Sequence, residues 1–328
     1  MSTPHLENTN YHFKSRKERY FPSEGSTLKP KKRLGQVFLK NKAFLSKIIK
    51  AGGISSKDTV LEIGPGKGVL TEALLQAGAK VLAIEKDPQL VIFLKEKFKT
   101  NKNLTVIHAD IRDVLNSKQF SCHSRISGNL KNYKVVGNIP YYLTSHLIHL
   151  LLELKHKPEI IILMIQKEVA QRIVAKPPKM NLLAVSVQFF AKPEIITYVP
   201  KSAFYPQPKV DSAIIKLTPH PIPVIARSEI PRSHSGQAPQ SLPVIASETW
   251  PCPPELQRRR ESFFQVIKAG FSHPRKLLIS NLSQSLKIPK NQLQEIFQKI
   301  NFPLNIRAQN LSLEDWKNLI KQLLPFSK

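Results

Sequence analysis

The sequence contains few of the residues that build secreted scaffolds or membrane proteins. Only 2 of its 328 residues are cysteine, Cys122 and Cys252, which excludes a disulfide scaffold and a cysteine-based zinc site and is typical of a reducing cytosol. No apolar run approaches the roughly 18 residues that span a bilayer. The first ten residues, MSTPHLENTN, lack the apolar stretch of a signal peptide. We therefore predict a cytoplasmic protein with no membrane-spanning segment and no bound metal.

Acidic residues are also scarce, since 23 Asp and Glu stand against 50 Lys and Arg, a formal net charge of +27. Such an excess attracts polyanions, so nucleic acid or an acidic membrane surface is the first partner to consider. The hydrophobic share of 41% is enough for a buried core and excludes global disorder. Lys and Arg are concentrated in residues 1–50 and 256–328. Two basic clusters flanking one core favour contact with an RNA or DNA backbone over merely solvated faces.

Short apolar runs alternate with segments of helical spacing along the middle of the chain. Strands are predicted at 58–63, 80–85, 104–108, 135–137 and 160–165, and helices at 69–77, 89–98 and 145–154. This alternation predicts a parallel sheet covered on both faces. Two later runs, Val185–Phe190 and Ala213–Leu217, are strand candidates that we expect to pair antiparallel. Helical patterns at 261–271, 275–286, 292–300 and 314–324 predict a small all-α domain.

Composition divides the chain into four parts. Residues 1–29 are polar and without periodicity, which predicts a mobile N-terminal arm. Residues 30–217 form the α/β domain, interrupted by a predicted insertion at 117–132. Residues 218–255 hold 9 of the 26 prolines of the chain, which predicts a disordered Pro-rich insertion. Residues 256–328 form the helical domain, which we expect to bind RNA.

The strongest local motif is LEIGPGKG at 61–68, where three alternate glycines follow a predicted strand and open a helix. Glycine is required where the backbone approaches a ligand closely or adopts a positive φ. A dinucleotide fingerprint has the spacing Gly-x-Gly-x-x-Gly, and here the third glycine comes one residue early. The glycines alone therefore fit a plain strand–helix turn about as well as a binding loop.

Two acidic residues at the ends of the following strands favour the binding loop. Glu85 ends the second strand, 21 residues after Gly64, where a carboxylate can bind both hydroxyls of a ribose. Asp110 follows the third strand and is placed to accept a hydrogen bond from an adenine amino group. Either acid alone would be interpreted as a helix N-cap. As a set, the loop and the two acids resemble the S-adenosylmethionine site of class I methyltransferases.

A second motif, Asn138-Ile139-Pro140-Tyr141, follows the fourth predicted strand. A proline turn or a capped helix start would also explain it. Its chemistry suits an adenine N6 amine, whose lone pair is delocalised into the ring. The Asn138 oxygen and a nearby backbone carbonyl can accept the two N–H bonds, and Tyr141 can stack on the base. Positioning and electrostatics suffice for methyl transfer without a general base, provided that the base leaves its helix.

Five segments occur in the order KRLGQVFL, LEIGPGKGVLT, VVGNIPYYLTS, MIQKEVAQRI and AFYPQPKVDSAI. With these segments the chain is similar to the rRNA adenine N6,N6-dimethyltransferases, and within them it most resembles the bacterial KsgA/RsmA type. The resemblance covers about 30–116, 133–217 and 256–328. It implies a class I S-adenosylmethionine-dependent methyltransferase (Rossmann-like) α/β domain with a small all-α C-terminal domain.

The resemblance also implies a set of site residues. Cofactor contacts are expected from Gln36, Val37, Leu39, Gly64, Gly66, Glu85, Asp110 and Asn138, and catalytic contacts from Asn138, Pro140, Tyr141 and Phe204. Val37 stands where this family often has Asn, so a polar side-chain contact is lost there, while a backbone contact is still available. Phe204 matches an aromatic that would help to clamp the flipped adenine, and core packing is the alternative.

The resemblance implies dimethylation of two adjacent adenosines near the 3′ end of 16S rRNA, by a monomer acting on the small ribosomal subunit during its maturation. It thereby names rRNA, and no membrane, as the partner of the basic clusters. Two alternatives stay open. One is a 23S rRNA adenine N6-methyltransferase of the macrolide-resistance type, and the other is a non-catalytic ribosome-assembly or nucleic-acid-binding factor. DNA adenine methylation is disfavoured, because that class usually has Asp in place of Asn138.

Overall fold

The computed structural model describes residues 30–31, 34–116, 132–154, 156–220 and 254–323. The predicted N-terminal arm, the predicted insertion at 117–132 except its last residue, and most of the predicted insertion at 218–255 lie outside these described residues. Within the described ranges, no helix is long and apolar enough to cross a membrane.

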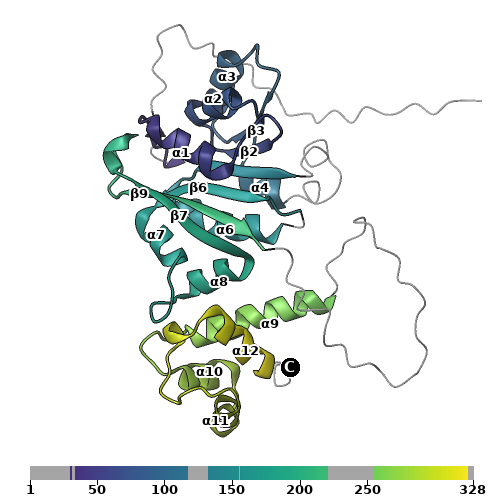
Figure 1. The fold of residues 1–328 in the computed structure, drawn as a ribbon, viewed down its shortest axis with the longest axis vertical. Helices are drawn as coiled ribbons and strands as arrows, with labels where there is room; N and C mark the ends of the chain where they lie inside the picture. The colour runs from purple at the N-terminus through teal and green to yellow at the C-terminus, as the bar shows by residue number, and fades with distance from the viewer. Residues whose placement is uncertain (1–29, 32–33, 117–131, 155, 221–253, 324–328) are drawn as a thin grey trace, which may run out of the picture.

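A seven-stranded sheet forms the centre of the α/β domain (Figure 1). Its strands follow the order β4-β3-β2-β5-β6-β9-β7, in which β4 to β6 are parallel and β9 runs antiparallel to β6 and β7. The strands are β2 (Thr59–Ile63), β3 (Lys80–Glu85), β4 (Leu104–His108), β5 (Tyr133–Asn138), β6 (Ile160–Gln166), β7 (Ala191–Val199) and β9 (Ser212–Pro219). The predicted parallel strands and the predicted fold class are therefore confirmed.

Helices cover both faces of this sheet, because successive side chains of a strand point to opposite faces. In β6, for example, Ile162 joins the apolar cluster on one face and Leu163 the cluster on the other. The first face packs against α1 (Ala43–Gly52) and α2 (Val69–Gln76). The second packs against α4 (Ile111–Asn116), α6 (Thr144–Glu153), α7 (Lys167–Ile173) and α8 (Leu182–Phe190), while α3 (Pro88–Lys97) lies beside β3 and β4.

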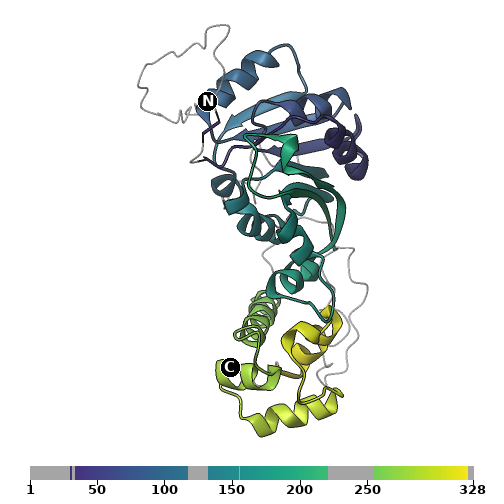
Figure 2. The same cartoon turned by 90° about the vertical axis from the view of Figure 1, so that its left-hand side faces the viewer.

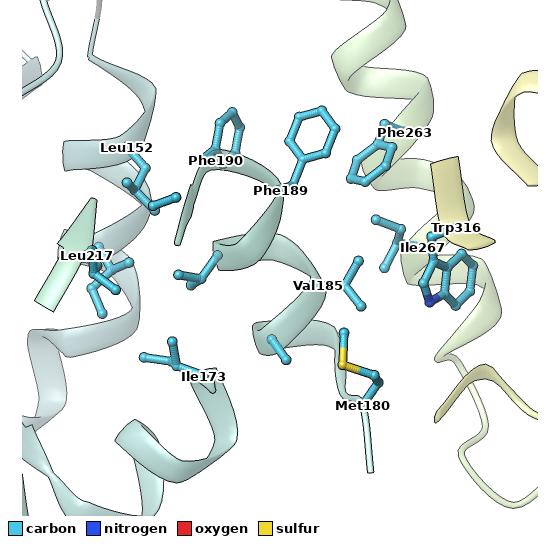
Figure 3. Packing of buried hydrophobic residues seen from close by; sticks show 14 of the residues in the cluster. Leu152, Ile173, Met180, Val185, Phe189, Phe190, Leu217, Phe263, Ile267 and Trp316 are labelled. Atoms are coloured by element: carbon cyan, nitrogen blue, oxygen red, sulfur yellow. The ribbon is translucent and has the colours of Figure 1, made fainter. Parts of the chain in front are cut away.

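Helix α8 corrects the predicted strand at Val185–Phe190. The helix lies between the sheet and the C-terminal helices (Figure 3), so it is apolar on most of its sides and shows little helical periodicity. The Asn181 side chain begins the helix by accepting a hydrogen bond from the Ala184 N–H (3.0 Å). The predicted strand Ala213–Leu217 lies in β9, and its antiparallel partners are instead β6 and β7, of which β7 follows α8 directly.

Four α-helices lie within residues 254–323, the described part of the C-terminal unit, as predicted from the 3.6-residue spacing. They are α9 (Pro254–Gly270), α10 (Leu278–Leu286), α11 (Lys290–Lys299) and α12 (Leu313–Leu323). The unit lies at the end of the molecule away from α1 to α3 in both views (Figures 1 and 2). Its position places the helical unit well apart from the glycine-loop end of the sheet.

An aromatic cluster joins this unit to α8 (Figure 3). The ring centroids of Phe189 and Phe263 are 3.9 Å apart, and Phe190 stacks on Phe264 at 5.6 Å. Trp316 of α12 is fully buried in the same apolar cluster. One continuous core therefore links the sheet to the helical unit, and the predicted division into separate domains stays a prediction.

Candidate active site

A pocket opens at the carboxyl ends of β2, β3, β4 and β5, and residues 34–39 contribute to its lining. Ligand sites of parallel α/β sheets usually lie at this edge. The structure brings together at this pocket the predicted residues Gln36, Val37, Leu39, Gly64, Gly66, Glu85, Asp110, Asn138 and Pro140. Stretches far apart in the sequence thus meet at one place, and the contact of each residue with a cofactor stays a prediction.

The loop between β2 and α2 depends on glycine at two positions. Gly66 has a φ of +59°, and a Cβ atom there would lie 3.0 Å from the Phe38 ring. Gly68 has a φ of +74°, and a Cβ atom there would lie 2.7 Å from the side chains of Leu94 and Phe98. The early third glycine therefore serves the packing of the loop against α3.

Glu85 is held by the backbone on both of its oxygens. Oε2 accepts a hydrogen bond from the Gly66 N–H (3.1 Å), and Oε1 accepts one from the Asp87 N–H (2.9 Å). The side chain is buried, and this burial raises the pKa of Glu85 although the amide hydrogen bonds lower it. Each oxygen retains a lone pair, so the carboxyl group is oriented and still able to accept the hydroxyls of a ribose.

Asp110 carries more hydrogen bonds than the sequence suggested. Oδ1 accepts from the backbone N–H (3.0 Å) and Nε (3.1 Å) of Arg112, and Oδ2 accepts from Nη2 of Arg112 (2.7 Å) and Nζ of Lys86 (2.8 Å). The Arg112 guanidinium, followed by Lys86, holds the pKa of Asp110 well below its usual range. An adenine amino group can bond to Asp110 only if one of these partly exposed cations moves aside.

Asn138 is oriented from across the pocket. Its Nδ2 donates a hydrogen bond to the backbone carbonyl of Val37 (2.8 Å). This bond turns Oδ1, the acceptor that an adenine amine requires, away from Val37. Residue 37 therefore contacts the site through its backbone, which a valine provides as well as an asparagine.

The two adjacent tyrosines of the motif have different surroundings. Tyr141 begins a short 3₁₀ turn (Tyr141–Leu143), and its hydroxyl shares a hydrogen bond with the Ser212 hydroxyl (3.0 Å). Tyr142 lines the pocket, with 63% of its surface exposed, next to Gly35. Tyr142 joins the pocket lining although the sequence motif did not single it out, because the direction of each ring depends on the turn and leaves no signal in the residue types. Tyr141 is not part of the lining among the described residues, and its stacking on a base stays a prediction.

Phe204 lies in the core beneath the pocket wall. It is 2% exposed and belongs to the apolar cluster that includes Leu39. Strand β8 (Phe204–Tyr205) pairs with β1 (Phe38–Leu39), which places Phe204 opposite Leu39. This packing is the alternative that the sequence left open, and the structure does not bring Phe204 to the pocket lining.

Asp87 holds the segment that contains Gln36 and Val37 in place through hydrogen bonds. Its carboxylate accepts hydrogen bonds from Lys31 Nζ (2.7 Å) and Gln36 Nε2 (3.1 Å), and its own N–H donates to Glu85. Burial alone raises the pKa of Asp87, but the bonds from Lys31 and Gln36 outweigh it and lower the pKa. The sequence did not indicate this role, because Asp87 has the pattern of a helix N-cap. Asp87 is also the N-cap of α3, since its side chain accepts a hydrogen bond from the Gln89 N–H.

Glu62 is a second functional candidate that sequence reasoning missed. It lines the pocket below the glycine loop and is 1% exposed. Oε2 accepts a hydrogen bond from the Thr71 hydroxyl (2.7 Å), and within the described ranges Oε1 has no hydrogen-bond partner. Burial raises the pKa of Glu62 to about 8. A buried oxygen without a protein partner in a pocket wall is available to an ordered water or to a polar group of a ligand.

Known proteins that are similar in sequence agree with the resemblance that the sequence motifs indicate. The family model described as "Ribosomal RNA adenine dimethylase" matches residues 27–232. The "Ribosomal RNA small subunit methyltransferase A" of Dehalococcoides mccartyi is 39% identical over 296 residues, which cover 90% of this chain and 89% of that protein. The protein of the same name from Geobacillus thermodenitrificans is 33% identical and covers 90% of this chain and 91% of its own length.

Solved structures also resemble most of the chain. A dimethyladenosine transferase from Plasmodium falciparum matches with a TM-score of 0.66 and 25% identity, covering 88% of this chain and 98% of that one. A 23S rRNA methyltransferase, ErmE, matches with a TM-score of 0.60 and 23% identity over 87% and 99% of the two chains. The similarity to ErmE, at 23% identity, supports a shared fold only.

Proposed function

The chain belongs to the ribosomal RNA adenine dimethylase family, and from this premise we propose its substrate and the use of its pocket. The protein dimethylates the N6 atoms of two adjacent adenosines near the 3′ end of 16S rRNA in the small ribosomal subunit, with S-adenosylmethionine as methyl donor. The relatives at 33–39% identity carry the small-subunit name, which supports this target over 23S rRNA.

The residues of the pocket fit this cofactor. Gly66 keeps the loop free of a side chain, Glu85 presents oriented acceptors of the kind that a ribose requires, and Glu62 has a buried oxygen with no partner among the described residues. When bound, the cofactor supplies a methyl group on a positively charged sulfur. We propose that its ribose lies against Glu85 and its adenine near Asp110.

The observation that carries the proposal is the Asn138 amide fixed by the Val37 carbonyl in the wall of the same pocket. Oδ1 of Asn138 accepts one N–H of the target amine and directs the nitrogen lone pair toward the methyl carbon. The bound cofactor would supply the methyl group that the amine gains, and the amine would release one proton to solvent. A hydrogen-bond acceptor already in position acts on the transition state without reorganisation.

Purified protein, S-adenosylmethionine and undermethylated small subunits would test this function. Mass mapping of the rRNA should find dimethylated adenosines at two adjacent positions near the 3′ end of 16S rRNA. Large subunits incubated in parallel provide the control. Methylation of 23S rRNA alone would favour the large-subunit alternative, and binding of subunits without any methylation would favour the non-catalytic alternative.

A further inference from the structure

An exposed aromatic side chain stands directly beside the pocket wall. Tyr205 is 53% exposed, although it belongs to the short ribbon that β8 forms with β1. The ribbon places Tyr205 opposite Phe38, and Phe38 lines the pocket with its ring against Gly66. Directly opposite residues of an antiparallel pair share one face of the ribbon. Tyr205 is therefore the solvent-facing neighbour of a pocket residue.

A lysine accompanies this tyrosine. Nζ of Lys40 lies 5.2 Å from the centroid of the Tyr205 ring, within the range of a cation–π contact. The Lys40 N–H donates a hydrogen bond to the Ala203 carbonyl (2.8 Å), which holds the two strands of the ribbon together just past β1. A flat ring with a cation beside it provides a stacking surface for a base and a contact for the phosphate attached to it.

We propose that Tyr205 and Lys40 bind the nucleotide next to the adenosine that is being methylated. The base of this nucleotide stacks on the Tyr205 ring, and its phosphate contacts Lys40. The proposal rests on the proposed function, in which the target adenosine has a second adenosine beside it. Because Tyr205 and the pocket share the β1–β8 ribbon, a stacked neighbour keeps the RNA strand in register while the target base occupies the pocket.

The chain offers a matched control for this pair. Tyr198 is 47% exposed, and Nζ of Lys167 lies 5.2 Å from its ring centroid. However, Tyr198 belongs to β7, the edge strand that β9 and β6 separate from the pocket strands. A general contribution of exposed tyrosines to RNA binding would involve both rings, whereas the proposed nucleotide site involves Tyr205 only.

The test compares Tyr205→Ala, Tyr205→Phe, Lys40→Gln and Tyr198→Ala by kcat/KM for undermethylated small subunits and by the Kd of S-adenosylmethionine. Stacking energies predict that Tyr205→Ala lowers kcat/KM by roughly tenfold or more, while Tyr205→Phe retains the ring and stays within about twofold. Lys40→Gln should reduce the salt dependence of subunit binding by about one phosphate contact. Tyr198→Ala should leave kcat/KM unchanged, and all four variants should bind the cofactor as the wild type does.

Three results would overturn the proposal: an unchanged kcat/KM in Tyr205→Ala, an equal loss in Tyr198→Ala, or a loss of cofactor affinity in Tyr205→Ala as large as the loss of methylation. The last result would mean that Tyr205 only holds β1 in place. Methylation of small subunits by the wild-type protein in the same assay tests the proposed function separately. Failure of the nucleotide site and failure of the proposed function are thus distinguishable.

Discussion

The pocket wall and the interface between α8 and α9 are held by different interactions. In the wall, Asn138, Glu85 and Asp87 bond to groups from distant stretches of the chain. At the interface, Phe189 and Phe263 pack ring against ring. A hydrogen bond fixes direction but contributes only about 1 kcal/mol to stability, whereas buried aromatic area contributes more and is largely non-directional. Geometry and stability therefore depend on separate residues, which can be changed separately.

The largest effect is expected at the interface. Phe263→Ala removes a ring that is 4% exposed and should lower the free energy of unfolding by about 3–5 kcal/mol. The Kd of S-adenosylmethionine for the folded protein should not change. Denaturant unfolding and titration calorimetry measure the two quantities. Ile92→Ala, at a residue that is 45% exposed on α3, is the control and should change stability by less than about 0.5 kcal/mol. A large loss of cofactor affinity in Phe263→Ala would contradict the conclusion that pocket geometry and stability depend on separate residues.

At Asn138 we expect a loss of catalytic activity instead of a loss of stability. Asn138→Ala removes the oriented acceptor and should lower kcat by about 10²- to 10³-fold, with binding of the small subunit retained. Methyl transfer from labelled cofactor and a subunit binding assay measure the two quantities. The exposed Asn103→Ala serves as control. Wild-type methylation by the Asn138 variant would refute the catalytic assignment.

The pocket residue Glu62 should make the free energy of unfolding depend on pH. Its folded-state pKa of about 8 lies above the usual 4.5, so between these values the folded state binds one proton more than the unfolded state. The Glu62 contribution should therefore be fully present below about pH 4.5 and should decline by about 1.4 kcal/mol per pH unit up to about pH 8. Glu62→Gln stays neutral and should lack this slope. Parallel curves of unfolding free energy against pH for the two proteins would show that Glu62 is not responsible.

The smallest effect is expected at Asp87, which acts only through the groups that it holds. Asp87→Asn should loosen Lys31 and Gln36 and weaken S-adenosylmethionine binding by about tenfold, which corresponds to one charge-assisted hydrogen bond. The kcat at saturating cofactor should fall much less. Glu96→Gln removes the exposed ion pair with Lys99 and should change neither value. A fall in kcat without a change in cofactor affinity would contradict the fastening role of Asp87.

The sequence predicted the parallel strands and the C-terminal helices, and most of the predicted site residues lie in the pocket lining. Those features depend on local periodicity and on the rule that loops at the carboxyl ends of parallel strands meet. The prediction was wrong for Val185–Phe190, because a helix that is buried on most sides has the same apolar composition as a buried strand. It also passed over Glu62 and Asp87, whose neighbours come from other strands, helices and the segment 30–40.

By itself, the sequence determined which residue types stand at the strand ends: the glycine loop, Glu85, Asp110 and Asn138. Only the tertiary structure decided how these groups are oriented. The Val37 carbonyl turns the Asn138 amide, and the 3₁₀ turn directs Tyr142 rather than Tyr141 into the pocket lining. The physical reason is that strand periodicity follows from neighbouring residues, while the direction of a side chain depends on partners that folding brings from far along the chain.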